Sequence, residues 1–521
     1  MSQPVTRTAE TPVLNAIDLS VVSVLSSGGA LEASGEQRKL VCLLSDGRLL
    51  IADGQSMNPH VQSYRARLDR MGQPFQACAA SIEVISRAYR RLGTESRDRP
   101  HSHTVMQVEA KDLLARGCRN RASDIHIRVN AHSTEFFFRI HNDLIKVGGQ
   151  TRDYGERLLA TIYGAMTKVS DNSYKPTERQ DASIGDRDKL PDMLYGVRIA
   201  TVPTSEGSLM VLRLLYNDAG DHVDLRPLGF TDEHATLIQV LKDQPIGMNV
   251  ISGPTGSGKS TTLQRVLSGQ LIESQGKLHV LTVEDPVEYP IPGAVQTAVT
   301  NASTEQERSR LFSAAISNSM RLDPDTIMIG EIRDGASASS ALRAAMTGHQ
   351  VWTTVHANSA VAIIDRLVDL GLPLAMAADH TVITGLISQR LVKLLCPHCK
   401  KRLPAHPAAL PETLMQRLHS ALGDHLIEVC LTGDGCDACN GRGTTGRTVV
   451  AEVIMPDAKF YAHLRAADKT GALAYWCNEL GGRSIVEHAI AKVAAGLIDP
   501  QVAEKTVGHL LADRPYNPIQ A

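Results

Sequence analysis

The sequence predicts an α/β protein whose largest domain is built on a parallel β-sheet covered by helices on both sides. Three observations support this prediction. From residue 231 onward, short apolar runs alternate with helical segments, which is the pattern of a doubly covered parallel sheet. The first of these runs ends in a glycine-rich loop that opens a helix. The chain also has 521 residues, enough for roughly three to four domains.

Residues 1–105 are expected to form a small α+β domain. They contain a hairpin pattern around Asp46 and Gly47 and a helical run over residues 81–92. No residue in this part of the sequence carries recognisable chemistry. The surface of this domain could dock another protein.

Residues 106–216 are expected to form a second small α+β domain. This part contains two stretches with period-2 alternation, a helical segment and a strand pair, at residues 123–129, 134–147, 156–166 and 196–215. Residues 217–230 are rich in Asp, Gly and Pro and are predicted to be a linker. The remaining residues, 231–521, then form the largest domain.

Composition and charge narrow the class of protein. The formal net charge is -2, whereas a dedicated nucleic-acid binder usually has a clear excess of basic residues. The N-terminus is polar without the apolar core of a secretory signal, and no run approaches the ~18 apolar residues that span a bilayer. We therefore expect a soluble, cytoplasmic protein that reaches a membrane only through a partner and does not bind nucleic acid directly.

A phosphate-binding loop is the strongest motif in the sequence. The eight residues from Gly253 to Ser260 fit G-x-x-x-x-G-K-[ST], with an apolar strand before them and a helix-forming run after them. Such a loop turns backbone N–H groups toward phosphate, while the lysine reaches the β- and γ-phosphates and the serine hydroxyl binds Mg²⁺. The predicted nucleotide-binding residues are Gly253, Pro254, Thr255, Gly256, Ser257, Gly258, Lys259, Ser260 and Thr261.

Two acidic segments follow apolar strands of the same domain. Glu331 ends the run TIMIGE, as expected for the acidic strand that supports Mg²⁺ and water. Glu284 is the first carboxylate of the cluster EDPVE and should emerge at the same carboxyl edge of the sheet. Hydrolysis needs a carboxylate within reach of the attacking water, so Glu284 is a candidate general base.

Two histidines, His349 and His356, flank the apolar run VWTTV. A histidine at the end of a strand beside a nucleotide site is suited to sense the γ-phosphate. We expect His356 to have this role, and the alternative for either residue is an ordinary structural histidine.

Two C-x-x-C pairs lie in a Pro- and Cys-rich interruption at residues 396–443. Cys396, Cys399, Cys436 and Cys439 supply four thiolates, which make a closed tetrahedral zinc site with no open position for water. The chain has nine cysteines, and this spacing is typical of a metal site in a reducing compartment. His398 and Cys430 are expected not to be ligands because the four sulfurs complete the set.

Together these motifs resemble those of the type II secretion and type IV pilus assembly ATPases, which are RecA-like motors of the secretion superfamily. GPTGSGKSTT is similar to the family's phosphate loop, TVEDPVE to its Asp box, MRLDPDTIMIGEIRD to its Walker B segment and TGHQVWTTVHAN to its His box. CPHC and GCDACNGRGTTGR are similar to its tetracysteine element. The resemblance covers roughly residues 120–455.

This resemblance implies a RecA-like motor domain, a PAS-like second domain and a homo-hexamer that binds ATP between the two domains. Arg198 and Arg213 match the arginines that complete the family's site, where cations spread transition-state charge. The alternative for both is a surface or packing role. Either Glu284 or Glu331 is implied to activate water, and Glu284 is favoured because the Walker B glutamate usually serves Mg²⁺.

Some positions depart from the family's pattern, namely Arg128, Ala357 and residues 335–337. None lies in the phosphate loop, so ATP hydrolysis is still expected, and the departures concern coupling between subunits.

The function implied is a motor at the inner face of the bacterial inner membrane. Hydrolysis of ATP would move domains, and an inner-membrane platform protein would use that motion in type IV pilus assembly or type II secretion. The tetracysteine element favours assembly or export over retraction, and the short first domain favours a pilus system such as a plasmid-type thin pilus. The alternatives are a conjugative DNA-pumping motor, which needs basic pore residues, and a zinc scaffold that senses nucleotide without turnover.

Overall fold

The computed structural model describes residues 22–27, 31–82, 84–85, 88–89, 105–167, 173–217, 223–299, 304–403 and 409–511. The chain divides into two compact units, Met1–Thr104 and Val105–Ala521. Among the described helices, none is both long and apolar enough to cross a bilayer.

The first unit is a three-stranded sheet between two small apolar layers. Its elements are η1 (Leu25–Ser27), α1 (Gly35–Arg38), β1 (Val41–Leu43), β2 (Arg48–Ala52), α2 (Pro59–Arg70) and β3 (Gln76–Ala80). β1 and β2 are antiparallel, which confirms the hairpin predicted around Asp46 and Gly47, and β3 runs parallel to β2. The helix predicted over 81–92 is helical where it is described, at residues 82, 84, 85, 88 and 89, and its other residues after Ser81 lie outside the described part.

The second unit begins with a six-stranded antiparallel sheet in the order β6-β5-β4-β9-β8-β7. Its strands are β4 (Asp124–Val129), β5 (Ser133–Ile140), β6 (Asp143–Thr151), β7 (Gln180–Ile184), β8 (Leu194–Pro203) and β9 (Ser208–Tyr216). Helices α4 (Val105–Arg119), α5 (Arg152–Thr161) and η3 (Ile162–Met166) share its apolar core. The stretch 134–147 makes two strands, because His141 and Asn142 adopt positive φ angles of 48° and 72° and turn the chain.

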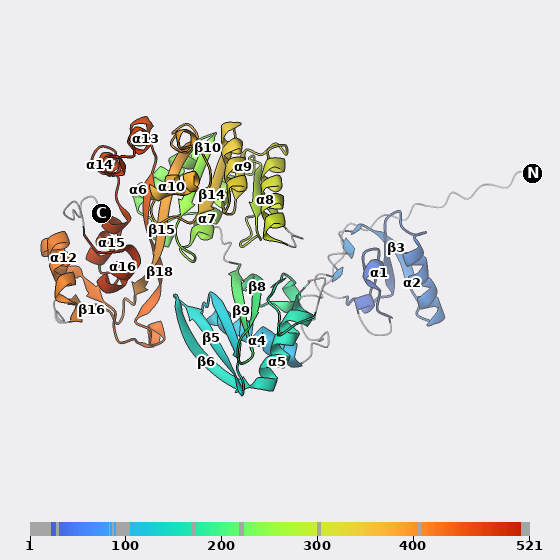
Figure 1. The fold of residues 1–521 in the computed structure, drawn as a ribbon. Helices are drawn as coiled ribbons and strands as arrows, with labels where there is room; N and C mark the ends of the chain where they lie inside the picture. Colours follow the sequence, from blue (N-terminus) through green and yellow to red (C-terminus); the bar gives the residue numbers. More distant parts are fainter. Residues whose placement is uncertain are drawn as a thin grey trace, which may run out of the picture. The chain divides into compact units, whose positions relative to one another are not determined.

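A seven-stranded sheet forms the rest of this unit, in the order β12-β11-β13-β14-β10-β15-β18 (Figure 1). The strands are β10 (Gly247–Ser252), β11 (Val280–Glu284), β12 (Val295–Ala298), β13 (Thr326–Ile329), β14 (Gln350–Val355), β15 (Ile383–Leu395) and β18 (Thr444–Ile454). All neighbouring pairs are parallel except β15 with β18. The predicted parallel sheet is confirmed.

Helices cover both faces of this sheet. On one face, α6 (Asp232–Asp243) and α7 (Lys259–Glu273) bury Leu241, Leu263 and Leu267 against strand residues such as Trp352. The opposite face packs against the helices α8 (Glu305–Ser319), α9 (Gly335–Met346), α10 (Ala362–Asp369), α13 (Ala458–Arg465) and α14 (Lys469–Asn478). Strand residues contribute to both layers, so their runs are apolar without alternation.

The cysteine-rich segment leaves the sheet between the adjacent strands β15 and β18. It contains β16 (Lys401–Arg402), α12 (Glu412–Leu422), η8 (Gly423–Glu428), β17 (Cys430–Leu431) and η9 (Asp437–Cys439). α12 shares an apolar core with α15 (Ile485–Ala494) and α16 (Pro500–Val507), beside the β18 edge of the sheet (Figure 1). This segment is therefore built on the seven-stranded sheet and packs against the C-terminal helices.

Two buried histidines lie where α6 meets α15. His234 and His488 are 3% and 2% exposed, and their ring centroids are 4.9 Å apart. His488 Nδ1 contacts the main chain of Ala451, whereas His488 Nε2 and His234 Nδ1 have no hydrogen-bond partner among the described residues. Burial lowers the pKa of His234 to about 4 and the pKa of His488 well below its usual value. The nearby cations Arg483 and Lys492 lower both pKa values further.

We predict that the free energy of unfolding falls as the pH is lowered from about 6.5 to 4. The unfolded chain protonates its histidines near pH ~6.5, whereas folded His234 stays neutral until about pH 4, so the unfolded state binds more protons in this window. His234 alone should account for a loss on the order of 2 kcal/mol between pH ~7 and ~5. Urea denaturation should show a smaller acid-induced loss in His234→Leu than in the wild type, and equal losses would contradict the prediction.

Candidate nucleotide site and metal centre

The predicted phosphate loop joins the end of β10 to the start of α7. Gly253, Gly256 and Gly258 have φ angles of 148°, 77° and 86°, a region that glycine adopts without steric cost. A Cβ on Gly253 would lie 2.3 Å from the carbonyl oxygen of Gln389, so the loop passes too close to β15 for any side chain. Because the loop ends at a helix N-terminus, it has the geometry of an anion-binding site.

Lys259 and Ser260 begin α7 and face different partners. Lys259 Nζ donates to the carbonyl oxygens of Gly253 (2.8 Å) and Pro254 (3.2 Å), across the loop. Burial lowers the pKa of Lys259, and the nearby Glu331 and Glu288 carboxylates oppose that change. Ser260 Oγ donates to the Glu288 carboxylate at 2.6 Å. Thr261 lines a neighbouring hollow of the same unit.

Glu284, at the end of β11, lies in the interior with 5% of its surface exposed. Its Oε1 accepts hydrogen bonds from Thr282 Oγ1 at 2.7 Å and Gln296 Nε2 at 2.9 Å. Burial raises the pKa of Glu284, and hydrogen bonds from Thr282, Gln296 and the main chain of Glu288 partly offset this rise. This carboxylate therefore holds neighbouring strands together at the edge of the site.

Glu288 is the last residue of the acidic cluster EDPVE, but it was not predicted to be a site residue. Besides accepting from Ser260, its carboxylate pairs with Arg198 Nη1 at 3.5 Å. It thus connects the start of α7 to β8 of the six-stranded sheet. The position of Glu288 in the acidic segment after β11 was the only sequence evidence for a role in the site. That position does not show which carboxylate of the turn points toward the phosphate loop.

Glu331 and His356 contact each other at the ends of two neighbouring strands. Glu331 follows β13 and His356 follows β14, and His356 Nε2 lies 2.8 Å from Glu331 Oε1. Glu331 Oε2 also accepts from Arg333 Nε at 2.9 Å. His349 lies at the opposite end of β14, where its Nδ1 contacts the Ala344 carbonyl oxygen at 3.1 Å. Only His356 is at the carboxyl edge of the sheet.

The two predicted arginines have different partners. Arg198 reaches Glu288, whereas Arg213 Nε donates to Asp124 Oδ1 at 3.0 Å, on the neighbouring strand of its own sheet. Two further arginines, Arg308 and Arg333, lie 3.5 Å and 3.4 Å from Asp285. Sequence reasoning did not find Arg308 and Arg333, because an arginine on a helix or after a strand carries no local signal of its partner.

Some of these groups line one cavity at the carboxyl ends of β11 and β13. Its lining includes Ser260, Glu284, Glu288, Glu331 and Arg333. Several of the predicted site residues are not in this lining, among them Lys259, His356, Arg198 and Arg213. The arrangement combines a helix N-terminus with a lysine, a hydroxyl, several carboxylates and arginines. It can hold a polyphosphate with a divalent cation and place a carboxylate near a water molecule.

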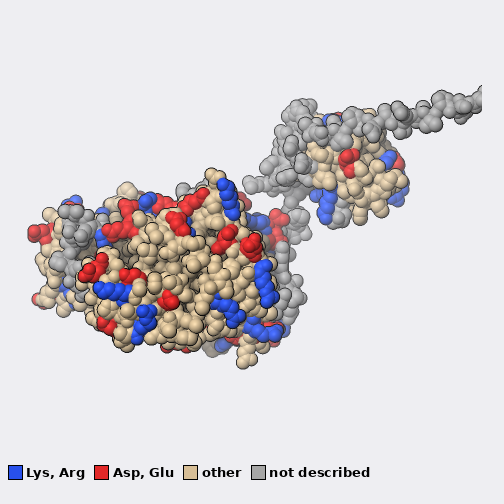
Figure 2. Space-filling model, turned by 90° about the horizontal axis from the view of Figure 1, so that it is seen from above, with Lys and Arg blue, Asp and Glu red and all other residues tan. Residues whose placement is uncertain are grey.

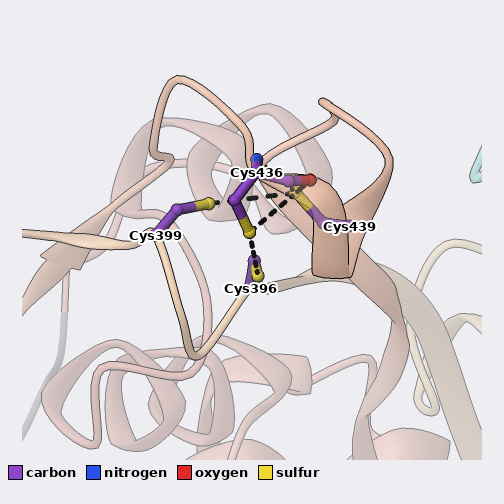
Figure 3. Close-up of side chains that lie close together, drawn as sticks. All are labelled: Cys396, Cys399, Cys436 and Cys439. Atoms are coloured by element: carbon purple, nitrogen blue, oxygen red, sulfur yellow. Dashed lines mark hydrogen bonds between the residues drawn. The ribbon is translucent and has the colours of Figure 1, made fainter.

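Four cysteine side chains converge where the insertion leaves β15 and returns to β18 (Figure 3). The Sγ atoms of Cys396 and Cys436 are 3.7 Å apart, those of Cys399 and Cys439 are 3.9 Å apart and those of Cys436 and Cys439 are 3.8 Å apart. A tetrahedral zinc ion with Zn–S bonds of ~2.3 Å places its sulfurs ~3.8 Å from one another. The cluster therefore has the dimensions of a four-sulfur metal site.

The environment of Cys439 favours the thiolate that a metal needs. Although burial alone would raise it, the pKa of the Cys439 thiol is lowered to about 6 by hydrogen bonds from the main-chain N–H groups of Cys436 and Gly443. Gly433 allows the two cysteine pairs to meet, because a Cβ there would lie 1.8 Å from the Cys399 carbonyl oxygen. His398 and Cys430 are not part of the cluster.

A phosphate loop between a parallel strand and a helix, beside carboxylates at the same edge of the sheet, defines a P-loop ATPase with a RecA-like fold. The family model described as Type II/IV secretion system protein matches residues 99–505. The chain belongs to this family of secretion ATPases, as the resemblance of its motifs predicted.

Curated relatives agree with this assignment. Type II secretion system protein E of Dickeya dadantii is 33% identical over 388 residues, which cover 74% of this chain and 72% of the relative. Type II secretion system ATPase E of Vibrio cholerae is 34% identical over 346 residues, which cover 66% of this chain and 64% of the relative.

Solved structures show the same fold. The Legionella pneumophila ATPase DotB matches with a TM-score of 0.54 at 21% identity, covering 78% of this chain and 97% of that one. The pilus retraction motor PilT with bound ADP matches with a TM-score of 0.50 at 21% identity, with the same coverage.

Proposed function

We propose that this ATPase powers type IV pilus assembly, or type II secretion, as a homo-hexamer that passes conformational change to an inner-membrane platform protein. The contact of Ser260 with Glu288 and of Glu288 with Arg198 supports this proposal most directly. It connects the phosphate loop to the six-stranded sheet through charged groups that bound nucleotide would rearrange. ATP binding and hydrolysis would therefore alter how these two parts of the unit are held together.

The residues at the sheet edge suggest a division of roles. Gly253–Thr261 would hold the phosphates of ATP, with Lys259 on the β- and γ-phosphates and Ser260 on Mg²⁺. The Mg²⁺ ion neutralises charge on the phosphates when it is bound. Arg198 and Arg213 would add positive charge to the transition state. The Glu331–His356 pair, joined at 2.8 Å, would respond to the γ-phosphate.

Glu288 is better placed than Glu284 to act on water. A general base must lie within hydrogen-bond reach of the proton that it accepts, so geometry decides first. Glu288 already contacts the hydroxyl that would hold Mg²⁺, whereas Glu284 is buried and bonded to Thr282 and Gln296. We therefore propose that Glu288 activates water, and that Glu284 and Glu331, the two candidates from the sequence, have supporting roles.

The motor would work at the cytoplasmic face of the bacterial inner membrane, through its partner. A partner is required by this proposal because no described helix can span a bilayer. The relatives are named for type II secretion and one similar structure is a pilus motor. The choice of pilus assembly follows from the tetracysteine insertion, as expected from the sequence.

A DNA-pumping motor is less well supported. Affinity for DNA comes largely from lysine and arginine side chains gathered along one surface. On the face of the larger unit seen in Figure 2, basic and acidic side chains are interspersed. The net charge of -2 points the same way.

We also propose that the four cysteines bind a structural zinc ion. A four-sulfur site leaves no open position, so the ion would fix the insertion and take no part in hydrolysis. The bound ion would hold together the two ends of the insertion between β15 and β18, next to the core shared by α12, α15 and α16.

The proposed ATP site predicts a distinct result for each of three variants. Lys259→Ala should lose at least about 100-fold in steady-state phosphate release, because it removes a phosphate contact. Glu288→Gln should bind nucleotide but lose about 100-fold in kcat, the usual contribution of a general base. Glu284→Gln should keep most of the activity, because the amide retains the Oε1 atom that accepts from Thr282 and Gln296.

Size-exclusion chromatography of the same samples with ATP and Mg²⁺ should give a ring-sized species. Undiminished turnover in Lys259→Ala would contradict the site. A larger loss in Glu284→Gln than in Glu288→Gln would return water activation to Glu284. A folded ring without any turnover, also in the presence of the platform protein's cytoplasmic part, would favour a nucleotide-sensing scaffold.

Removal of one sulfur ligand should release the metal. We predict about one zinc per chain in the wild type and a clear loss of zinc in Cys436→Ser, together with a lower Tm, because metal binding contributes to folding. Cys430→Ser is the matched control, since Cys430 is a buried thiol of the same segment outside the cluster. Equal zinc contents in wild type and Cys436→Ser, measured by atomic absorption, would exclude this site.

A further inference from the structure

Gln389 lies directly behind the phosphate loop. It belongs to β15, which runs parallel to β10 with Ser388 opposite Ser252. The next residue along β15 is Gln389, and the next residue after β10 is Gly253, the first residue of the phosphate loop. The Gln389 side chain is fully buried, with 0% of its surface exposed.

Both polar atoms of the Gln389 amide bond to the loop and its helix. Nε2 donates to the main-chain carbonyl oxygen of Ser257 at 2.8 Å, and Oε1 accepts from Thr262 Oγ1 at 2.9 Å. Ser257 and Thr262 are themselves buried, at 3% and 0% exposure. Water cannot replace these bonds, because the three groups face one another in the interior.

These bonds fix the direction of the peptide that precedes Gly258. In a planar trans peptide the carbonyl and the N–H of the next residue point in opposite directions. Since the Ser257 carbonyl points at Gln389, the Gly258 N–H points away from β15. Thr262 lies in the first turn of α7, so its bond to Gln389 holds the helix start against the same strand.

We infer that Gln389 is a positioning residue that holds the phosphate loop in its anion-binding form without contacting the nucleotide. This inference rests on the proposal that Gly253–Thr261 bind the phosphates of ATP. An amide suits the role because it donates to the carbonyl and accepts from the hydroxyl at the same time. A leucine of similar size does neither. It leaves the buried Ser257 carbonyl without a partner, while the Thr262 hydroxyl keeps a longer bond of 3.3 Å to the Gly258 carbonyl oxygen.

The test is equilibrium binding of fluorescent ADP, and of a fluorescent non-hydrolysable ATP analogue, to the full chain. Gln389→Leu should weaken both by about tenfold, the scale expected for an unsatisfied buried polar group. The loss of affinity should be similar for the two nucleotides, because the loop holds phosphates that both of them carry. Thr262→Val, which removes one of the two bonds, should weaken both by about threefold.

Gln350→Leu is the matched control for a general loss of stability. Gln350 is a buried glutamine at the start of β14, the opposite end of the sheet, where it bonds to Gln270 and to the main chain of Leu241 and Lys242. Its replacement should lower Tm and leave both affinities unchanged.

The possible outcomes separate this inference from the proposed site. Wild-type affinity in both Gln389→Leu and Thr262→Val, with binding lost in Lys259→Ala, would overturn the inference alone. An equal loss of affinity in Gln350→Leu would also overturn it, because the effect would then come from stability. Retained affinity in Lys259→Ala would instead overturn the proposed nucleotide site. If Gln389→Leu does not fold, Thr262→Val decides.

Discussion

The parallel pairing of β10, β11, β13 and β14 is the constraint on which the site depends. Because the strands run in the same direction, all of their carboxyl ends meet at one edge, and each end delivers a different group. β10 delivers the phosphate loop, β11 the acidic turn, β13 Glu331 and β14 His356. Residues that are far apart in sequence thus become neighbours without any long-range motif to mark them.

The same sheet also connects the site to the cysteine-rich segment. The buried carboxylate of Glu452 on β18 accepts from the main-chain N–H of Ala360 at 2.6 Å and of Ile485 at 3.2 Å. Ala360 lies in the segment after His356, and Ile485 begins α15. A carboxylate removed from water in this way is stable only when its oxygens are hydrogen-bonded. It therefore fixes the segment after His356 to the helix that packs against α12.

Much of the fold and the site could be predicted because the signals are local. The phosphate loop is specified by glycines at fixed spacing, and the buried parallel strands by continuous apolar runs. The four-cysteine cluster could be predicted from the spacing of the paired cysteines for the same reason. The sequence motifs also indicated the family of secretion ATPases to which the chain belongs.

What could not be predicted depends on side-chain direction and on distant partners. Spacing along the chain did not distinguish Glu284, which points into the interior, from Glu288, which points at Ser260. The contacts of Gln389 depend on β15 lying beside β10, across residues 253–382 of intervening chain. The two strands within 134–147 were read as one stretch because the apolar alternation continues on both sides of His141 and Asn142, although Asn is a common turn residue.

A structure of the chain with a non-hydrolysable ATP analogue and Mg²⁺ would show whether residues 253–261 hold the phosphates. We expect the phosphates to lie against the main-chain N–H groups of residues 256–261. Lys259 Nζ should move from the Gly253 carbonyl to the β- and γ-phosphates, and Ser260 Oγ should move from Glu288 to Mg²⁺. The Gln389 bonds to Ser257 and Thr262 should be unchanged. A nucleotide bound elsewhere, or bound with Ser260 still on Glu288 and Lys259 still on Gly253, would contradict the proposed site.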